Sequence, residues 1–139
     1  IKSAIEGYRP ENNRSQLLSK NGFDIILDAY NANPTSMRAA LENFSLMKAK
    51  RKTLIIGDMF ELGNTAAEEH QAISDLAENL HFDEIYLVGE NFYGTKTSLS
   101  KFKSFDALKE HLTKHPLEKA SLLIKGSRGM ALERVLEVL

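Results

Sequence analysis

The stretch FDIILDAYNANPTSMRAALENF, residues 23–44, contains the change of pattern that decides the fold. It begins with a continuously apolar run over residues 23–27, which is typical of a strand covered on both faces. A polar loop follows, and from Pro34 onward apolar residues recur at helical spacing. Asn33 is suited to cap this helix, and Pro34 costs no hydrogen bond at its first position. The stretch therefore predicts a buried strand, a polar turn and a helix in succession.

The same succession recurs toward the C-terminus. Further apolar strands are predicted at residues 53–56, 84–88 and 121–125, and helices at residues 34–50, 66–80, 105–115 and 130–139. The polar residues 93–103 are expected to be the least ordered part of the chain. Because strand and helix alternate four times, the sequence predicts a Rossmann-like, doubly wound α/β sheet of mostly parallel strands.

A hairpin is predicted upstream of the first parallel strand. Residues 15–19 and 23–28 both have strand character, and the intervening Asn21-Gly22 tolerates the positive φ of a tight turn. One antiparallel strand is therefore expected at this side of the sheet. The first residue is Ile1 rather than Met, in a short helical pattern that Pro10 stops. We expect residues 1–10 to be the tail of a preceding element and residues 11–139 to form one domain.

Composition argues against several classes of function. A length of 139 residues, 42% of them hydrophobic, suffices for one core. The net charge of -1 leaves no basic stripe for nucleic acid. No apolar run approaches the ~20 residues of a membrane span. Cys is absent, so nothing requires an oxidising compartment and a cytoplasmic location is expected.

Polar loops follow the four predicted parallel strands, where an open α/β sheet binds its ligands. They are residues 28–37, 57–63, 89–94 and 125–129. In the first loop, Asp28 can accept two hydrogen bonds from a ribose diol. The side-chain amides of Asn31 and Asn33 can donate and accept hydrogen bonds toward a peptide-like ligand. These residue types also commonly cap turns and helices, and spacing alone leaves both interpretations open.

The last loop, KGSRG, combines two glycines with Lys125, Ser127 and Arg128 before a predicted helix. This combination suits a carboxylate or a phosphate, although the charges could equally belong to a solvated loop. The pattern GxxxxGK[ST] occurs nowhere in the sequence, so a complete phosphate cradle for ATP hydrolysis is missing.

The histidines give no catalytic or metal site. His111 and His115 have the i, i+4 spacing of a chelating pair, but no third ligand is evident, and no metal site is predicted. His70 could reach back toward residues 57–63, and a packing or capping role is favoured over catalysis. No catalytic residue is predicted in this chain.

Three segments in order, ILDAYNANPTSMRAALENF, IIGDMFELG and LLIKGSRGMALERVL, resemble the C-terminal domain of the Mur ligases. The resemblance spans nearly the whole chain. Since YNANP followed by SM, then GDMxELG and KGSR, is a specific combination, it favours the branch that adds D-alanyl-D-alanine to UDP-N-acetylmuramoyl-tripeptide. Other branches carry an AHNP-like or AHTP-like sequence at the first position.

The resemblance implies a three-domain enzyme of peptidoglycan precursor synthesis. Its N-terminal domain would hold the UDP-linked tripeptide, and its central domain would supply the P-loop and bind most of the ATP and Mg²⁺. The C-terminal domain would close over the ATP site and position the D-alanyl-D-alanine acceptor. We therefore expect this chain to be inactive alone.

The resemblance also implies roles for single residues. Asp28 corresponds to the acid that holds the ATP ribose, and Arg14 to an arginine that reaches the nucleotide. Asn31 and Asn33, with Ser36, would face the dipeptide or the reacting phosphate. The KGSR residues Lys125, Ser127 and Arg128 would bind the carboxylate of the dipeptide.

Two other functions stay open at the level of sequence. A signalling receiver domain also needs acids and a lysine at strand ends, for which Asp28, Asp58 and Lys125 are available, but the adjacent acidic pair is missing because Asp28 lies between Leu27 and Ala29. A nucleotide-binding or ligand-binding α/β module without ligase activity is the second alternative.

Overall fold

The computed structural model describes residues 15–139, and the predicted tail at residues 1–10 and Arg14 lie outside this range. Strands β1 (Gln16–Lys20) and β2 (Phe23–Asp28) are antiparallel, and Lys20 pairs with Phe23. The two residues between the strands, Asn21 and Gly22, have φ values of 50° and 89°. Positive φ at both positions is the geometry that a two-residue hairpin turn requires. The predicted hairpin is therefore confirmed.

Six strands form one sheet in the order β1-β2-β6-β3-β4-β5. The remaining strands are β3 (Lys52–Gly57), β4 (Glu84–Val88), β5 (Ser100–Phe102) and β6 (Ser121–Lys125). All neighbours from β2 to β5 pair in parallel, and β1 with β2 is the antiparallel pair. The predicted Rossmann-like, mostly parallel sheet with one antiparallel strand is confirmed.

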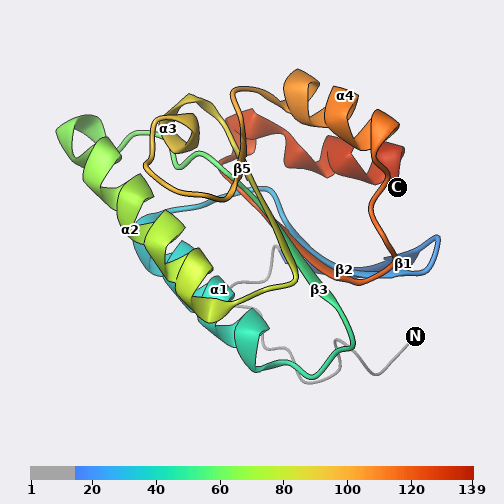
Figure 1. Ribbon diagram of the computed structural model, residues 1–139. Coiled ribbons are helices and arrows are strands. Elements are labelled where there is room, and N and C mark those ends of the chain that lie inside the picture. The colour runs from blue at the N-terminus through green and yellow to red at the C-terminus, as the bar shows by residue number, and fades with distance from the viewer. Residues whose placement is uncertain (1–14) are drawn as a thin grey trace.

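Helical segments cover both faces of this sheet, as Figure 1 shows. Helices α1 (Pro34–Leu46) and α2 (Ala66–Leu80) lie on one face, and α4 (Phe105–Lys114) lies on the other together with the 3₁₀ segment Leu132–Val138. Three shorter segments are Gly63–Thr65, α3 (Glu90–Tyr93) and Arg128–Met130. Two covered faces explain why the central strands are continuously apolar.

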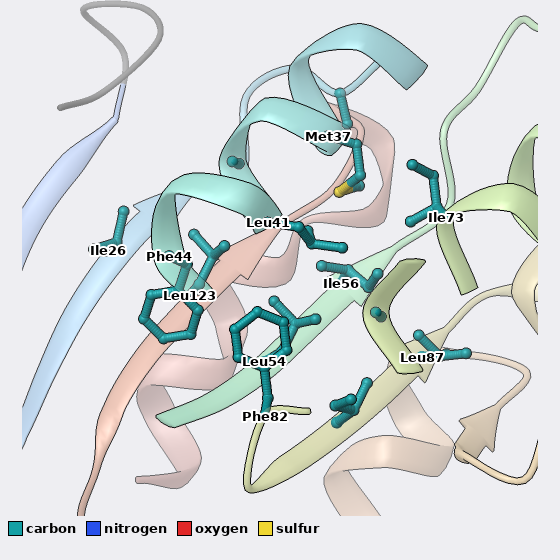
Figure 2. Close-up of a cluster of buried hydrophobic side chains, with 14 of the residues drawn as sticks. Ile26, Met37, Leu41, Phe44, Leu54, Ile56, Ile73, Phe82, Leu87 and Leu123 are labelled. Carbon is teal, nitrogen blue, oxygen red and sulfur yellow. The ribbon is translucent and has the colours of Figure 1, made fainter. Parts of the chain in front are cut away.

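The core between the sheet and the helices α1 and α2 is shown in Figure 2. Phe44 of α1 stacks on Phe82 with 5.3 Å between the ring centroids. Ile56 and Leu123 contribute from two adjacent strands and have no exposed surface. On the opposite face, alternate strand residues such as Ile55 pack in a second cluster that includes α4. These two layers hold the strand ends, and the loops that follow them, in fixed relative positions.

Three predicted elements differ in the structure. The helix predicted to reach residue 50 ends at Leu46, because Met47 has extended backbone angles. The predicted helix over 130–139 is two 3₁₀ segments, separated by Ala131 in the left-handed region with φ of 50°. Residues 93–103, expected to be the least ordered, contain β5, which pairs with β4. That strand is short and half-exposed, so its sequence lacks an apolar run.

Candidate site at the carboxyl edge of the sheet

Asp28 and Lys125 form a buried ion pair at the carboxyl ends of β2 and β6. The two residues are partners in the strand register, and Lys125 Nζ lies 2.7 Å from Asp28 Oδ2. Lys125 also donates to the carbonyl of Asn31 at 3.1 Å, and the Ser15 hydroxyl donates to Asp28 Oδ2 at 3.1 Å. Lys125 is 0% exposed and Asp28 is 3% exposed. The interpretation of Lys125 as a solvated loop charge is therefore wrong.

The second oxygen of Asp28 is an unused acceptor. Oδ1 is buried and has no hydrogen-bond partner within residues 15–139. A buried acceptor without a donor destabilises the folded chain by about 1–3 kcal/mol. A ligand that donates a hydrogen bond to Oδ1, such as a hydroxyl group, would remove this cost. Because Asp28 is almost fully covered, a ligand would reach Oδ1 only if the residues above it move.

Asn33 and Ser36 hold the start of α1. Asn33 Oδ1 accepts from the Ser36 N–H at 2.8 Å, while Ser36 Oγ accepts from the Asn33 N–H at 3.1 Å. This reciprocal arrangement is a capping box, so the capping interpretation is confirmed for Asn33. Asn31 lies before the helix with an exposed side chain, and only its carbonyl is tied to Lys125.

Asp58, which follows β3, connects its loop to the loop that follows β4. Asp58 Oδ1 accepts from the Phe92 N–H at 3.0 Å, and Oδ2 accepts from the Asn91 N–H at 2.9 Å and from its side-chain amide at 3.2 Å. Gly89 has a φ of 125°, and a Cβ there would lie 2.3 Å from the Asp58 carboxylate. The carboxylate is saturated by donors, which indicates a structural role and argues against proton transfer.

His70 fixes the loop 57–63 from beneath. The Met59 N–H donates to His70 Nε2 at 2.9 Å, and His70 Nδ1 lies 2.7 Å from the carbonyl of Ala66. Because a backbone N–H can only donate and a carbonyl can only accept, the ring is neutral with its proton on Nδ1. The imidazole is fully buried and packs edge-on against Phe92. The predicted reach toward residues 57–63, with a packing and capping role, is confirmed.

The side chains of the KGSR loop point to three different places. Lys125 turns inward to Asp28, whereas Ser127 Oγ accepts from the Phe60 N–H at 2.8 Å. The guanidinium of Arg128 lies over the Tyr30 ring, 5.2 Å from its centroid. The three side chains therefore do not point toward a single ligand in this conformation. Arg128 is exposed, whereas Lys125 and Ser127 are buried.

A cavity of about 420 Å³ lies at the same edge, on the side covered by α4. Its charged lining consists of Asp58, Glu90, Lys103 and Arg134. Sequence reasoning missed Lys103 and Arg134, because no local motif marks them and only the topology brings residues 58, 90, 103 and 134 together. Within residues 15–139, no group of three or more His, Asp or Glu side chains is placed to hold a metal ion.

In the described part of the chain, none of the helices combines the length and the apolar character that crossing a membrane would demand.

Fold and site together define a Rossmann-like domain with polar loops gathered at the carboxyl edge of a mostly parallel sheet. Residues 13–128 match the family model described as "Mur ligase, glutamate ligase domain", and the chain therefore belongs to this family. The interpretation as a signalling receiver domain is accordingly wrong. The Asp58 carboxylate accepts hydrogen bonds from the Asn91 and Phe92 N–H groups, so it does not form an acidic pair with Asp28.

Relatives with similar sequences are UDP-N-acetylmuramoyl-tripeptide--D-alanyl-D-alanine ligases. The chain is 33% identical to the UDP-N-acetylmuramoyl-tripeptide--D-alanyl-D-alanine ligase of Borreliella burgdorferi, over 99% of this chain and 32% of that protein. The enzyme of the same name from Treponema pallidum is 35% identical over 97% of this chain and 31% of that protein. The chain thus spans about a third of the length of these relatives.

Solved structures of full ligases contain the same fold. The MurF ligase from Thermotoga maritima, in complex with ADP, matches 90% of this chain and 30% of its own with a TM-score of 0.72 and 25% identity. MurF from Acinetobacter baumannii matches 96% of this chain and 30% of its own, with a TM-score of 0.71 and 29% identity.

Proposed function

We propose that this chain is the C-terminal domain, over residues 11–139, of an ATP-dependent ligase that joins D-alanyl-D-alanine to UDP-N-acetylmuramoyl-tripeptide. The names of the relatives and the family match support this activity. The observation that carries the proposal in this chain is the Asp28–Lys125 pair, which leaves one buried carboxylate oxygen without a donor at the ligand edge of the sheet. The proposal places the reaction in the bacterial cytoplasm, where ATP is available.

The reaction has two bond-forming steps. A carboxylate oxygen of the tripeptide attacks the γ-phosphorus of ATP and ADP leaves, which gives an acyl phosphate. The dipeptide amine then attacks the acyl carbon, the C–N bond forms, inorganic phosphate leaves and the amine loses its proton. The proposal assigns most of the ATP and Mg²⁺ contacts to a central domain. This chain contributes positioning, which can lower the barrier by several kcal/mol.

Asp28 and Arg14 are the residues proposed to contact ATP. The free Oδ1 of Asp28 fits a ribose hydroxyl as donor, and Lys125 holds the other oxygen so that the carboxylate stays oriented. Arg14 keeps its proposed contact with the nucleotide on the resemblance alone. The Thermotoga relative was solved in complex with ADP, which supports the use of ATP by the ligase proposed here.

Asn31, Asn33, Ser36, Ser127 and Arg128 remain proposed contacts of the dipeptide or of the reacting phosphate. These side chains differ in whether they already make hydrogen bonds within the chain. The exposed side chain of Asn31 and the exposed guanidinium of Arg128 can meet a ligand without breaking a hydrogen bond within residues 15–139, whereas Asn33 and Ser36 hold the helix cap.

The test is ATP-dependent amide formation by the full-length protein that contains this chain. Asn31→Ala should lower kcat/KM at least tenfold while thermal unfolding stays unchanged, because the side chain is exposed. Asp28→Asn, assayed at a temperature at which circular dichroism shows the variant folded, should raise the KM for ATP, since a carboxylate hydrogen bond of about 1.5–3 kcal/mol is weakened. Asn79→Ala, at an exposed position of α2, is the matched control. Wild-type turnover in both site variants would exclude the proposal.

A further inference from the structure

His111 of α4 and His115 at its C-cap form a pair of neighbouring imidazoles, to which the site at the carboxyl edge gives no role. The His115 N–H donates to the His111 carbonyl at 2.8 Å, so the helical spacing persists up to the C-cap. Residues four apart on a helix lie on the same face. The two ring centroids are 4.9 Å apart, and the ring planes are tilted by 36°. The two imidazoles therefore lie side by side at the end of α4.

This separation fits two imidazoles that bind one metal ion. A zinc ion about 2.0–2.1 Å from a ring nitrogen lies roughly 3.2 Å from the centroid of that ring. Two rings that are separated by roughly 90–110° at the metal then have centroids about 4.5–5.2 Å apart. The observed distance of 4.9 Å lies inside this range. Rotation of the side chains, without movement of the helix, therefore suffices to bring one nitrogen of each ring to a common ion.

Both imidazoles have unused nitrogen atoms. Within residues 15–139, neither His111 nor His115 makes a hydrogen bond or an ion pair through its ring. His70, by contrast, uses both of its ring nitrogens in the core. The half-buried ring of His111 packs against Phe102 and Tyr86, with centroids 5.0 Å and 6.0 Å away, whereas His115 is exposed. His111 is thus held in place, and His115 can turn to meet a ligand.

The charges around this pair are compatible with a bound cation. Lys114, the neighbour of His115 in sequence, lies 3.5 Å from Glu110, and both side chains are mostly exposed. Their opposite charges offset each other, and solvent screens what remains. The ion would also lie at the C-terminal end of α4, where the helix dipole favours positive charge.

We propose that His111 and His115 chelate one Zn²⁺ ion at the end of α4, independently of the proposed ligase function. Imidazole suits Zn²⁺ and its neighbours Cu²⁺ and Ni²⁺, whereas Mg²⁺ and Ca²⁺ prefer oxygen ligands. Within residues 15–139 no third His, Asp or Glu joins the pair, so water fills the remaining coordination positions. The prediction of no metal site from the sequence required a third protein ligand, which a surface chelate completed by water does not need.

Calorimetric titration of the full-length protein with ZnCl₂ in excess Mg²⁺ tests the proposal. His111→Gln and His115→Gln should each weaken one zinc-binding event about 100-fold, because the second imidazole of a chelate acts at high effective concentration. His81→Asn is the matched control. It removes an exposed histidine whose φ of 58° Asn also adopts, and it should bind Zn²⁺ as the wild type does. The same zinc affinity in the wild type and both site variants overturns the proposal.

A variant with changed spacing separates chelation from binding by single histidines. Thr113→His combined with His115→Gln keeps the number of histidines, but it places the pair at i and i+2, which do not face each other on a helix. This double variant should bind Zn²⁺ as weakly as His115→Gln alone. Wild-type affinity in the double variant would show that the helical pair does not chelate the ion.

Amide hydrogen exchange of the same proteins locates the ion. Zn²⁺ should raise the protection of residues 111–115 in the wild type, because an ion held by both imidazoles stabilises the last turn of α4. The rise should be absent in His115→Gln. Equal protection with and without Zn²⁺ in the wild type, at a zinc concentration that saturates the calorimetric titration, would place the ion elsewhere and overturn the proposal.

Discussion

Asp58 illustrates how a single buried carboxylate can organise several loops. Its side chain receives the N–H groups at the start of α3, and its carbonyl accepts from the Ser127 N–H at 3.1 Å. The loops after β3, β4 and β6 are therefore linked through one residue. This arrangement requires Gly89 to approach the carboxylate closely, with a backbone conformation that other residues rarely adopt.

Gly89→Ala should destabilise the chain by more than about 2 kcal/mol, because it combines a positive φ with a Cβ placed 2.3 Å from the Asp58 carboxylate. Gly63→Ala is the matched control. Gly63 has a φ of 62°, but nothing lies within 4 Å of its Cβ position, so only the backbone cost of about 1–2 kcal/mol applies. Urea unfolding followed by circular dichroism gives both values, and equal losses would show that Asp58 moves aside freely.

Tyr86 gives a prediction for alkaline pH. Burial and its hydrogen bond to Glu84 raise the pKa of Tyr86 above its ordinary value of 10.0. The stability that this provides is fully present below pH 10 and is lost as the pH rises toward the higher pKa of the folded state. The free energy of unfolding of the wild type should therefore be about 1 kcal/mol larger than that of Tyr86→Phe at pH 7. This difference should shrink above pH 10.

Urea unfolding of both proteins from pH 7 to pH 11 measures the difference. Lys52 also has a shifted pKa, which burial lowers against the opposing effect of Asp83. Because Lys52 is present in both proteins, its contribution cancels. A difference that stays constant with pH would show that Tyr86 titrates alike in the folded and unfolded chains.

The sequence identifies the residue types of the site better than their contacts. Asp28 and Lys125 are recognisable because each is a polar residue at the end of an apolar strand. Their pairing is not recognisable, since 97 positions separate them and the strand order brings them together. Asn33 is predicted well because helix capping is a local interaction. Arg134 is missed because its position depends on the ring of Phe105, far away in the sequence.

At the scale of elements, strong local patterns are predicted correctly and weak ones are not. The strands β2, β3, β4 and β6 are apolar runs covered on both faces, and the hairpin has its turn dipeptide. By contrast, β5 has three half-exposed or exposed residues and depends on pairing with β4. The end of α1 also depends on tertiary contacts, which a helical periodicity does not reveal.

Lys52 should be the residue that stabilises the end of α1. Its ammonium donates to the carbonyls of Phe44 and Ser45 in the last turn and to that of the C-cap residue Met47, where helix geometry leaves carbonyls short of donors. Lys52→Met should cost about 1–2 kcal/mol, because a cation at a helix C-terminus and its hydrogen bonds are lost. Lys48→Met, at an exposed neighbouring position, should be nearly neutral.

Amide hydrogen exchange locates the effect of Lys52→Met. Amides in the last turn of α1 should lose more protection than those of the central strands. Protection of the central strands should fall only by as much as the global free energy of unfolding falls. If protection in α1 is unchanged, the helix end is held by core packing through Phe44 rather than by Lys52.

For the molecule as a whole, the Asp28–Lys125 pair joins the first and last parallel strands. Asp28→Asn or Lys125→Met alone should cost about 3–5 kcal/mol, because each leaves a buried group without its partner. The double variant should cost clearly less than the sum of the two, as measured by urea unfolding in a double-mutant cycle. Additive losses would mean that the two charges do not interact.

The position of β6 has a consequence for synthesis of the chain. This strand is the last of the six in sequence, yet it lies between β2 and β3 near the centre of the sheet. Until residues 121–125 have left the ribosome, the hairpin and the β3-β4-β5 part share no strand, and both present an unpaired apolar edge. The sheet can therefore close only after β6 has been synthesised, and the nascent chain exposes aggregation-prone edges until then.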